Sequence, residues 1–245
     1  YSRLSQLRSF LLGLSRNIES SSSSEEKFGR LLKATHFSAV KTACKGVSGL
    51  ANIEMKTAIA LLRFSDVLLA DRCYYEAGVE CRKAGSHSEA FVFLNHFLDL
   101  EECIEEGDGS ILDVDDLRIT DFPLEVPLPE DLSLSREERE EVREWVLAIS
   151  MDQKVEQGLP VDSRGVYVGS LTCPANGSTP LQECALTGYP IRGGVVRFED
   201  TSRVVDREDW NRLLNAARQA SEGSPLNDVL GFVQEWCGNL PTYTF

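Results

Sequence analysis

The chain has 245 residues, a net charge of −14 and a hydrophobic fraction of 42%. This length exceeds that of an average domain and predicts two folded units with sizeable cores. No window approaches the roughly 18 apolar residues of a membrane-spanning helix, which argues against membrane insertion. The acidic excess repels nucleic acid and anionic lipid, so we expect no nucleic-acid partner. The chain opens with Tyr1 and lacks a signal-peptide pattern, which predicts a fragment of a larger protein.

Charges and cysteines are unevenly placed along the chain. Residues 1–50 carry 8 basic and 3 acidic side chains, whereas residues 101–150 carry 4 basic and 17 acidic ones. We interpret the acidic stretch as a solvated linker, with an acidic docking site as the alternative. The seven cysteines are odd in number and scattered, which is typical of reduced thiols rather than of a disulfide framework.

Helical periodicity dominates the chain up to about residue 106. One stretch, YYEAGVECRKAGSHSEAFVFLNHFLDL, spans residues 74–100 and places small residues at Gly78 and Ala90. It resembles one unit of the tetratricopeptide repeat (TPR) family, in which two helices cross where small residues permit close approach. Because one helical pair cannot bury its own apolar face, we expect neighbouring pairs and a TPR-like array over residues 1–107. A plain helical bundle is the alternative.

Two connecting segments are predicted next. Residues 108–134 are acidic and contain three prolines, which force an extended backbone. The apolar residues interleaved in this linker predict that it lies against a folded surface. Ser135 and Glu138 have the spacing of a capping box. They start a helix that is predicted over residues 135–157 and is expected to pack on the C-terminal domain.

The last part of the chain, residues 158–245, is predicted to be a small α+β domain. The stretches RGVYVGSL and VVRF are its strand candidates, and the pair Gly193-Gly194 is typical of a hairpin turn. Two helices follow, with Asp206 and Ser224 as their N-caps. The predicted fold class is therefore mostly α, a TPR-like helical repeat array followed by a small α+β domain.

This C-terminal part offers no pattern for catalysis or metal binding. After residue 100 there are four cysteines, no histidine and no CxxC pair, whereas a structural zinc site needs four such ligands, usually in close pairs. A nucleophilic cysteine needs a histidine base in reach, and every histidine lies in the first half of the chain. We therefore expect no metal, no cofactor and no catalytic residue.

The stretch CALTGYPI, residues 184–191, resembles the first loop of the U-box family, the metal-free relatives of RING domains. The resemblance implies a U-box-like domain over residues 158–245, in which polar contacts replace zinc ions and Cys184 is a buried thiol. It also implies a small apolar surface that binds ubiquitin or a ubiquitin-conjugating enzyme. The residues expected on that surface are Leu186, Tyr189, Pro190, Ile191, Trp210, Leu213 and Pro225. The alternative is that Leu186 and Ile191 pack inward.

A wider pattern, CALTGYPI…DREDWNRLL…DVLGFVQEWCGNLP, resembles the C-terminal end of a family of large WD-repeat and TPR subunits of intraflagellar transport train complex B. The resemblance implies a non-catalytic ciliary scaffold that contacts other components of train complexes B and A. It also implies weak ubiquitin binding by the U-box-like domain. The alternative function is a U-box-type ubiquitin ligase that recruits a conjugating enzyme. The second U-box loop is shortened to ASEGSP here, which disfavours the ligase.

Overall fold

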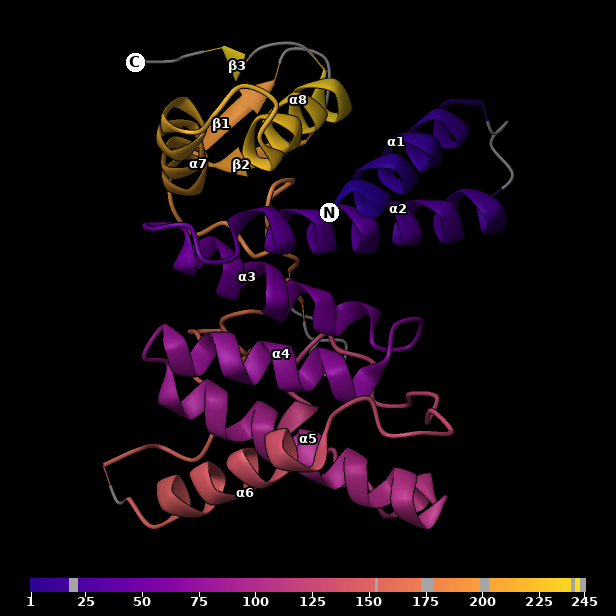
Figure 1. The fold of residues 1–245 in the computed structure, drawn as a ribbon, viewed down its shortest axis with the longest axis vertical. Coiled ribbons are helices and arrows are strands. Elements are labelled where there is room, and N and C mark those ends of the chain that lie inside the picture. The colour runs from indigo at the N-terminus through magenta and orange to yellow at the C-terminus, as the bar shows by residue number, and fades with distance from the viewer. Residues whose placement is uncertain (18–21, 153, 173–178, 199–202, 239–240, 243–245) are drawn as a thin grey trace. The chain divides into compact units, whose positions relative to one another are not determined.

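The structure is a computed structural model that describes all residues except 18–21, 153, 173–178, 199–202, 239–240 and 243–245. The described chain is mostly helical and contains one small sheet (Figure 1). No helix in the described part is long and apolar enough to cross a membrane. The helices are α1 (Ser2–Asn17), α2 (Ser22–Cys44), α3 (Ala51–Leu61), α4 (Ala70–Lys83), α5 (His87–Glu106), α6 (Arg136–Ser150), α7 (Arg207–Gln219) and α8 (Pro225–Cys237). The strands are β1 (Val195–Phe198), β2 (Val204–Asp206) and β3 (Pro241–Thr242), and short 3-10 helices occupy Leu62–Phe64, Gly109–Ile111 and Asp115–Leu117.

Two compact units make up the chain, and they are not consecutive in sequence. The first unit combines Tyr1–Leu61 with Leu181–Phe245, and the second unit is Leu62–Pro180. The second unit is therefore an insertion between the two halves of the first. The sequence predicted consecutive domains instead. The compact units have other boundaries, because helices α1 to α3 share a core with the C-terminal segment.

The first unit packs its three N-terminal helices with a small sheet and two C-terminal helices. The sheet is antiparallel, in the order β2-β1-β3, with Val196 of β1 opposite Val205 of β2. Helix α2 contacts both α1 and α8. The shared core draws Leu11, Leu12, Leu32, Val40 and Ile53 from the N-terminal helices, and Leu186, Val205, Trp210, Leu213 and Val233 from the C-terminal segment.

Local signals in the C-terminal segment are largely confirmed. The Asp206 side chain accepts hydrogen bonds from two backbone amides of α7, and Ser224 caps α8 with Pro225 at its first position. The stretch VVRF forms strand β1. The hairpin prediction was wrong, however, because Gly193 and Gly194 precede β1 rather than joining it to β2. These two glycines lie in the segment that leads into β1, and the Gly194 carbonyl accepts a hydrogen bond from the Arg207 amide.

The second unit is built around the helical pair α4 and α5. The turn between them contains Gly85, whose φ of 81° lies in the left-handed region that glycine adopts without strain. The helices approach closely at Gly78, where an added Cβ would lie 2.5 Å from Leu94 Cγ. The small residue that the sequence placed at this position is therefore required by the packing of α4 on α5.

We expect Gly78→Ala to destabilise the second unit by about 2 kcal/mol, because overpacking a tight helix contact typically costs 1–3 kcal/mol. Gly231→Ala is the matched control, since Gly231 is also helical but has open space around its Cα. Alanine there gains helix propensity and should stabilise α8 by about 0.5–1 kcal/mol. Urea unfolding of both variants measures the difference. Equal effects of the two substitutions would contradict the close approach.

The linker after α5, residues 108–134, packs against the rest of the second unit, as its interleaved apolar residues predicted. Leu117 and Phe122 are buried, and the Phe122 ring lies 6.2 Å from that of Phe93 and 6.0 Å from that of Tyr167. Tyr167 lies in RGVYVGSL, for which the strand prediction was wrong. That stretch has two glycines and irregular partners instead: the Tyr167 amide donates to the Ile119 carbonyl, and Arg63 donates to the Gly169 carbonyl.

Helix α6 begins with the predicted capping box. The Ser135 amide donates to Glu138 Oε2 at 3.0 Å, and the Glu138 amide donates to Ser135 Oγ at 3.3 Å. The helix ends at Ser150, seven residues before the predicted end, and it belongs to the second unit, where it packs on α5. Arg139 of α6 carries much of this contact. Its guanidinium lies 2.7 Å from Glu105 and 3.6 Å from the buried carboxylate of Glu101.

This contact predicts a pH dependence of the second unit. Burial raises the pKa of Glu101 to about 7, although Arg139 and Arg143 act in the opposite direction. Because the pKa of Glu101 is about 7 in the folded chain and about 4.5 in the unfolded chain, protonation favours the folded state. This contribution to stability is complete below about pH 4.5 and is lost as the pH rises through 7. We therefore expect Glu101→Gln to stabilise the chain by about 2 kcal/mol at pH 8 and to change little at pH 5.

Urea unfolding at the two pH values measures this difference. Glu105→Gln is the matched control, because Glu105 contacts the same Arg139 but is exposed. Because an exposed ion pair contributes little, Glu105→Gln should change the free energy of unfolding by less than about 1 kcal/mol. A Glu101→Gln effect that is equal at pH 5 and pH 8 would contradict the raised pKa.

Candidate interaction site at the Cys184 loop

The loop that resembles a U-box opening is a tight, strongly bonded turn. The Cys184 amide donates to the Tyr189 carbonyl at 3.0 Å, and the Gly188 amide donates to the Cys184 carbonyl at 2.7 Å. The Ala185 amide donates to the Val204 carbonyl at 2.8 Å, which fixes the loop on β2. Gly188 has a φ of 70°, a conformation that favours glycine. The backbone of this loop is therefore held firmly from within the first unit.

Cys184 is a buried thiol, as the resemblance implied. Its side chain is fully buried, and its sulfur accepts a hydrogen bond from the Asp206 amide at 3.3 Å. Burial raises the pKa of the thiol, although hydrogen bonds from Asp206 and Thr187 act in the opposite direction. A protonated, inaccessible thiol is neither a nucleophile nor a metal ligand. In the described part of the chain, no group of three or more His, Cys, Asp or Glu side chains is placed to hold a metal ion, and Cys173 lies outside that part.

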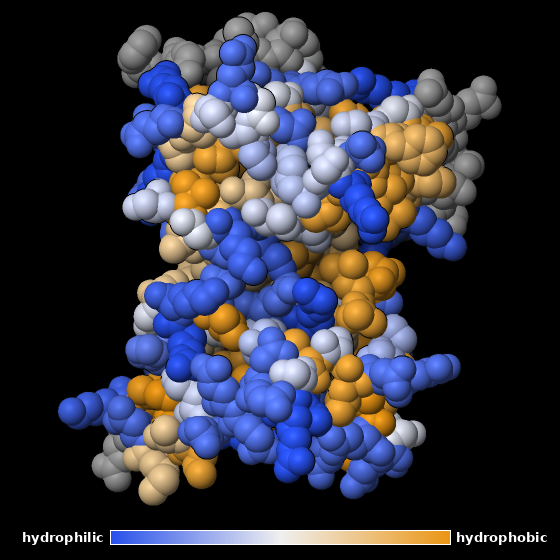
Figure 2. Space-filling model, in the orientation of Figure 1, coloured by the Kyte–Doolittle hydropathy of each residue, from blue (hydrophilic) through white to orange (hydrophobic). Residues whose placement is uncertain are grey.

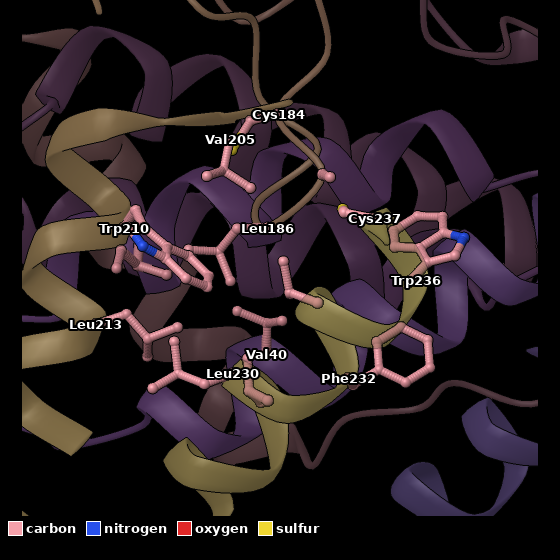
Figure 3. Close-up of a cluster of buried hydrophobic side chains, with 14 of the residues drawn as sticks. Val40, Cys184, Leu186, Val205, Trp210, Leu213, Leu230, Phe232, Trp236 and Cys237 are labelled. Atoms are coloured by element: carbon pink, nitrogen blue, oxygen red, sulfur yellow. The ribbon is translucent and has the colours of Figure 1, made fainter. Parts of the chain in front are cut away.

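Most residues expected on a ubiquitin-binding surface lie inside the core. Figure 3 shows Leu186 beside Trp210, within a cluster that also contains Leu213 and Val40 of α2. The inward orientation, given as the alternative for Leu186 and Ile191, is the one observed, because helices from residues 1–61 cover the loop. Leu186, Pro190, Ile191, Trp210 and Leu213 are buried, Tyr189 is half-buried, and Pro225 is exposed.

Helices α2 and α3 lie directly against the loop. An added Cβ at Gly188 would come within 2.7 Å of the Phe37 ring and 2.8 Å of Ala60 Cβ. The Lys56 ammonium of α3 lies 5.8 Å from the Tyr189 ring centre, within range of a cation–π interaction. The loop therefore faces its own N-terminal helices, and Tyr189 is the apolar side chain of the loop that keeps partial access to solvent.

Among the residues that the structure describes, four ion pairs join the N-terminal helices to the C-terminal segment. Sequence reasoning missed them, but the basic excess of residues 1–50 was a signal, because three of the four cations come from that stretch and the fourth, Lys56, follows it closely. Of the two pairs that involve a lysine, Lys56–Asp209 is the more buried. The Asp209 carboxylate is buried and therefore needs a cationic partner. The pairs are Arg8–Asp228 at 2.7 Å, Arg16–Glu235 at 3.0 Å, Lys33–Glu183 at 2.5 Å and Lys56–Asp209 at 2.8 Å.

His36 is the centre of a second, uncharged link to the loop. Its Nε2 lies 3.0 Å from the Ala185 carbonyl, and its ring stacks on Phe232 at 5.0 Å. Burial and the neighbouring Arg8 lower the pKa of His36 to about 3, so the ring is neutral near pH 7 and Nε2 donates to the carbonyl. Sequence reasoning had assigned this histidine no role, because an isolated histidine gives no signal of its packing.

Arg8 extends this link to helix α8. Its guanidinium is fully buried, lies 4.0 Å from the Phe232 ring centre and donates to Asp228. Asp228 also accepts hydrogen bonds from Tyr1 and Ser5. Burial alone would raise the pKa of Asp228, but these hydrogen bonds and the charge of Arg8 hold it below its usual value. The carboxylate therefore stays charged and compensates the buried guanidinium.

Comparison with known proteins gives the chain its relatives. No family model matches it. It is 41% identical over 247 residues to the Intraflagellar transport protein 172 homolog of Danio rerio, and the alignment covers 98% of this chain and 14% of the relative. The Mus musculus homolog is 39% identical over 249 residues, covering 100% of this chain and 14% of the relative. The Drosophila melanogaster homolog is 44% identical over 241 residues, covering 95% and 13%. The chain, which spans about one seventh of the length of these curated relatives, is a homologous segment of the intraflagellar transport protein 172 family.

Proposed function

We propose that the chain is the C-terminal, non-catalytic interaction region of an intraflagellar transport subunit, acting in the cilium or flagellum, at the ciliary base and in the cytoplasm. The observation that carries this proposal is the similarity of nearly the whole chain to proteins named for intraflagellar transport. We infer that the region contacts other components of train complexes B and A. The helical composition supports this role, because helical arrays offer extended surfaces for partners.

Cross-linking mass spectrometry of assembled trains tests this proposal with the full-length protein. Lys83 on α4 and Lys154 after α6 are exposed and provide reactive amines in the second unit. We expect cross-links from these lysines to other transport subunits. Cross-links confined to the protein itself, in trains that show abundant cross-links elsewhere, would overturn the proposed contacts.

We further propose that α4 and α5 form a TPR-like pair and that the C-terminal segment is U-box-like. The close approach at Gly78 supports the first assignment. The order of loop, small sheet and two helices supports the second, as do polar contacts within the segment, from the Asp206 amide to the buried Cys184 sulfur and from the Ala185 amide to the Val204 carbonyl. In a metal-free domain such polar contacts take over the stabilising role of metal ions.

Ubiquitin binding by the C-terminal segment is a separate proposal, and the structure exposes few of the residues expected to take part in it. Only Tyr189 and Pro225, of the seven residues expected to bind, expose side-chain surface. Binding through Leu186 therefore requires α2 and α3 to leave the loop, and the alternative function as a U-box-type ligase has the same requirement. We expect no ubiquitin chains from the intact 245-residue chain in an autoubiquitination assay. Chains that form with the wild type and disappear with Tyr189→Ala would favour the ligase.

A further inference from the structure

Helix α6 changes character along its length. Eight of the nine residues from 136 to 144 are charged, whereas none of residues 145–151 is. Val146 is buried, and α6 packs on α5. Leu147 and the C-cap residue Met151, in contrast, are 64% and 78% exposed. The last turns of α6 are therefore apolar on the buried side and also towards solvent, whereas a helix that packs on one side only is polar on the other.

The exposed apolar residues form one continuous spot. Leu147 and Met151 are four residues apart and are therefore neighbours on one helix face, and the exposed Ala148 lies three residues before Met151. Figure 2 shows hydrophobic side chains on the surface at the lower left, where α6 ends in Figure 1. We refer to Leu147, Ala148 and Met151 as the apolar end of α6. Contiguous exposed apolar residues are typical of an interaction surface, and methionine adapts its shape to different partners.

The surroundings of the apolar end are acidic. The second unit, residues 62–180, contains 26 acidic and 10 basic side chains, a net charge of −16. Glu137 and Glu144 are exposed and precede Met151 at spacings of seven residues, which places all three on one helix face. Among the residues that the structure describes, neither glutamate forms an ion pair. The apolar end also lies at the negative pole of the α6 dipole.

These charges select the partner of the apolar end. A second copy of the chain would bring Glu137 and Glu144 against like charges, and an anionic lipid surface would be repelled in the same way. A partner with large apolar side chains flanked by lysine or arginine matches both the apolar spot and its acidic surroundings. An amphipathic helix presents such side chains on one face.

We propose that the apolar end of α6 is a docking site for a basic amphipathic helix of another protein. This helix would belong to one of the train components that the proposed function already invokes, so the inference rests on that function. The apolar spot comes from one helix end and falls below the size of a standard interface. The contact is therefore weak and exchangeable when it acts alone.

Model peptides test the chemistry of the site on the intact 245-residue chain. One peptide carries leucine on one helix face and lysine on the others, and its twin carries glutamate in place of lysine. Fluorescence anisotropy measures the binding of both. We expect the lysine peptide to bind with a Kd on the order of tens of micromolar and its twin to bind at least about tenfold more weakly. Equal binding of the two peptides would overturn the proposed charge complementarity.

Substitution of Leu147 separates this site from binding to the acidic unit as a whole. We expect Leu147→Gln to weaken binding of the lysine peptide about tenfold, because the buried leucine contact is lost. Leu124→Gln is the matched control, since Leu124 is a leucine of the same unit that is 38% exposed, and it should leave the Kd unchanged. Far-UV circular dichroism checks that both variants keep their helices. Equal Kd values for Leu147→Gln and the wild type would overturn the site.

A photoreactive benzophenone side chain at position 147 of the full-length protein tests the site in assembled trains. The same group at position 102, an exposed position on α5, is the control. We expect position 147, and not position 102, to cross-link to a segment of another subunit that has more lysine and arginine than aspartate and glutamate. Cross-links to this protein itself, to lipid or to an acidic segment would overturn the proposal.

The lysine cross-links described above keep this inference distinguishable from the proposed function. If Lys83 and Lys154 reach other transport subunits but the group at position 147 does not, the docking site is wrong and the interaction region stands. If none of the three positions reaches another subunit, the docking site and the proposed contacts both fail.

Discussion

Residues 158–245, produced without the N-terminal helices, are expected not to unfold cooperatively. Leu186, Trp210 and Leu213 bury their side chains in a core to which α1, α2 and α3 contribute. Removing residues 1–61 would expose that core and leave the carboxylates of Asp209 and Asp228 without their cations. A small domain has little stability to lose, since most domains are stable by only about 5–15 kcal/mol.

Near-UV circular dichroism and urea unfolding of residues 158–245 measure this effect. A single chain that joins residues 1–61 to residues 181–245 through a flexible linker is the control, and we expect it to fold, because it restores the whole first unit. Cooperative unfolding of residues 158–245 alone, with the near-UV signal of buried tryptophan, would show that the C-terminal segment does not need the helices.

Gly188→Ala is expected to destabilise the first unit by about 3 kcal/mol. The added Cβ would lie 2.7 Å from the Phe37 ring and 2.8 Å from Ala60 Cβ, and overpacking of this kind costs about 1–3 kcal/mol. The left-handed φ of 70° adds about 1 kcal/mol for a residue with a side chain. Thermal and urea unfolding measure the loss.

Gly193→Ala is the matched control in the same segment. Gly193 is exposed, and the nearest atom to its added Cβ is an Asp206 carboxylate oxygen at 3.8 Å, an ordinary contact distance. We expect a change within about 0.5 kcal/mol. A Gly188→Ala variant as stable as Gly193→Ala would mean that α2 and α3 do not press on the loop.

Sequence reasoning succeeded where one short stretch contains the whole cause. The caps at Ser135, Asp206 and Ser224 could be predicted because each side chain bonds an amide two or three residues away. The stretch RGVYVGSL has the alternation of a strand but forms a series of turns, in which the Gly165 amide donates to the nearby Asp162 carbonyl. The Tyr167 amide and the Gly169 carbonyl find their partners in Ile119 and Arg63, which lie far away in sequence. No local pattern carries that information.

At the candidate site, the burial of Cys184 could be predicted from the sequence, whereas the orientation of Leu186 could not. The buried thiol of Cys184 followed from the lack of partner ligands and from the loop it resembles. Whether Leu186 points outward could not be predicted, since an apolar residue in a loop has no period that assigns it to a face. The orientation is set by α2 and α3, more than 100 residues earlier in the sequence. The contact between the N-terminal helices and the C-terminal segment was indicated in the composition by the basic excess of residues 1–50 alone.

The insertion of the second unit has a consequence for synthesis on the ribosome. The apolar sides of α1, α2 and α3 emerge before the second unit, but their partner segment begins only at Leu181. At about 5–20 residues per second, the intervening stretch takes roughly 6–24 seconds to translate. The inserted unit is complete once Pro180 has been made, and it can then fold before the C-terminal segment is finished, which shortens the flexible connection between the two halves of the first unit and lowers the entropy cost of joining them. Nascent N-terminal helices are therefore exposed to chaperones, and a premature stop codon after residue 180 leaves them without a core.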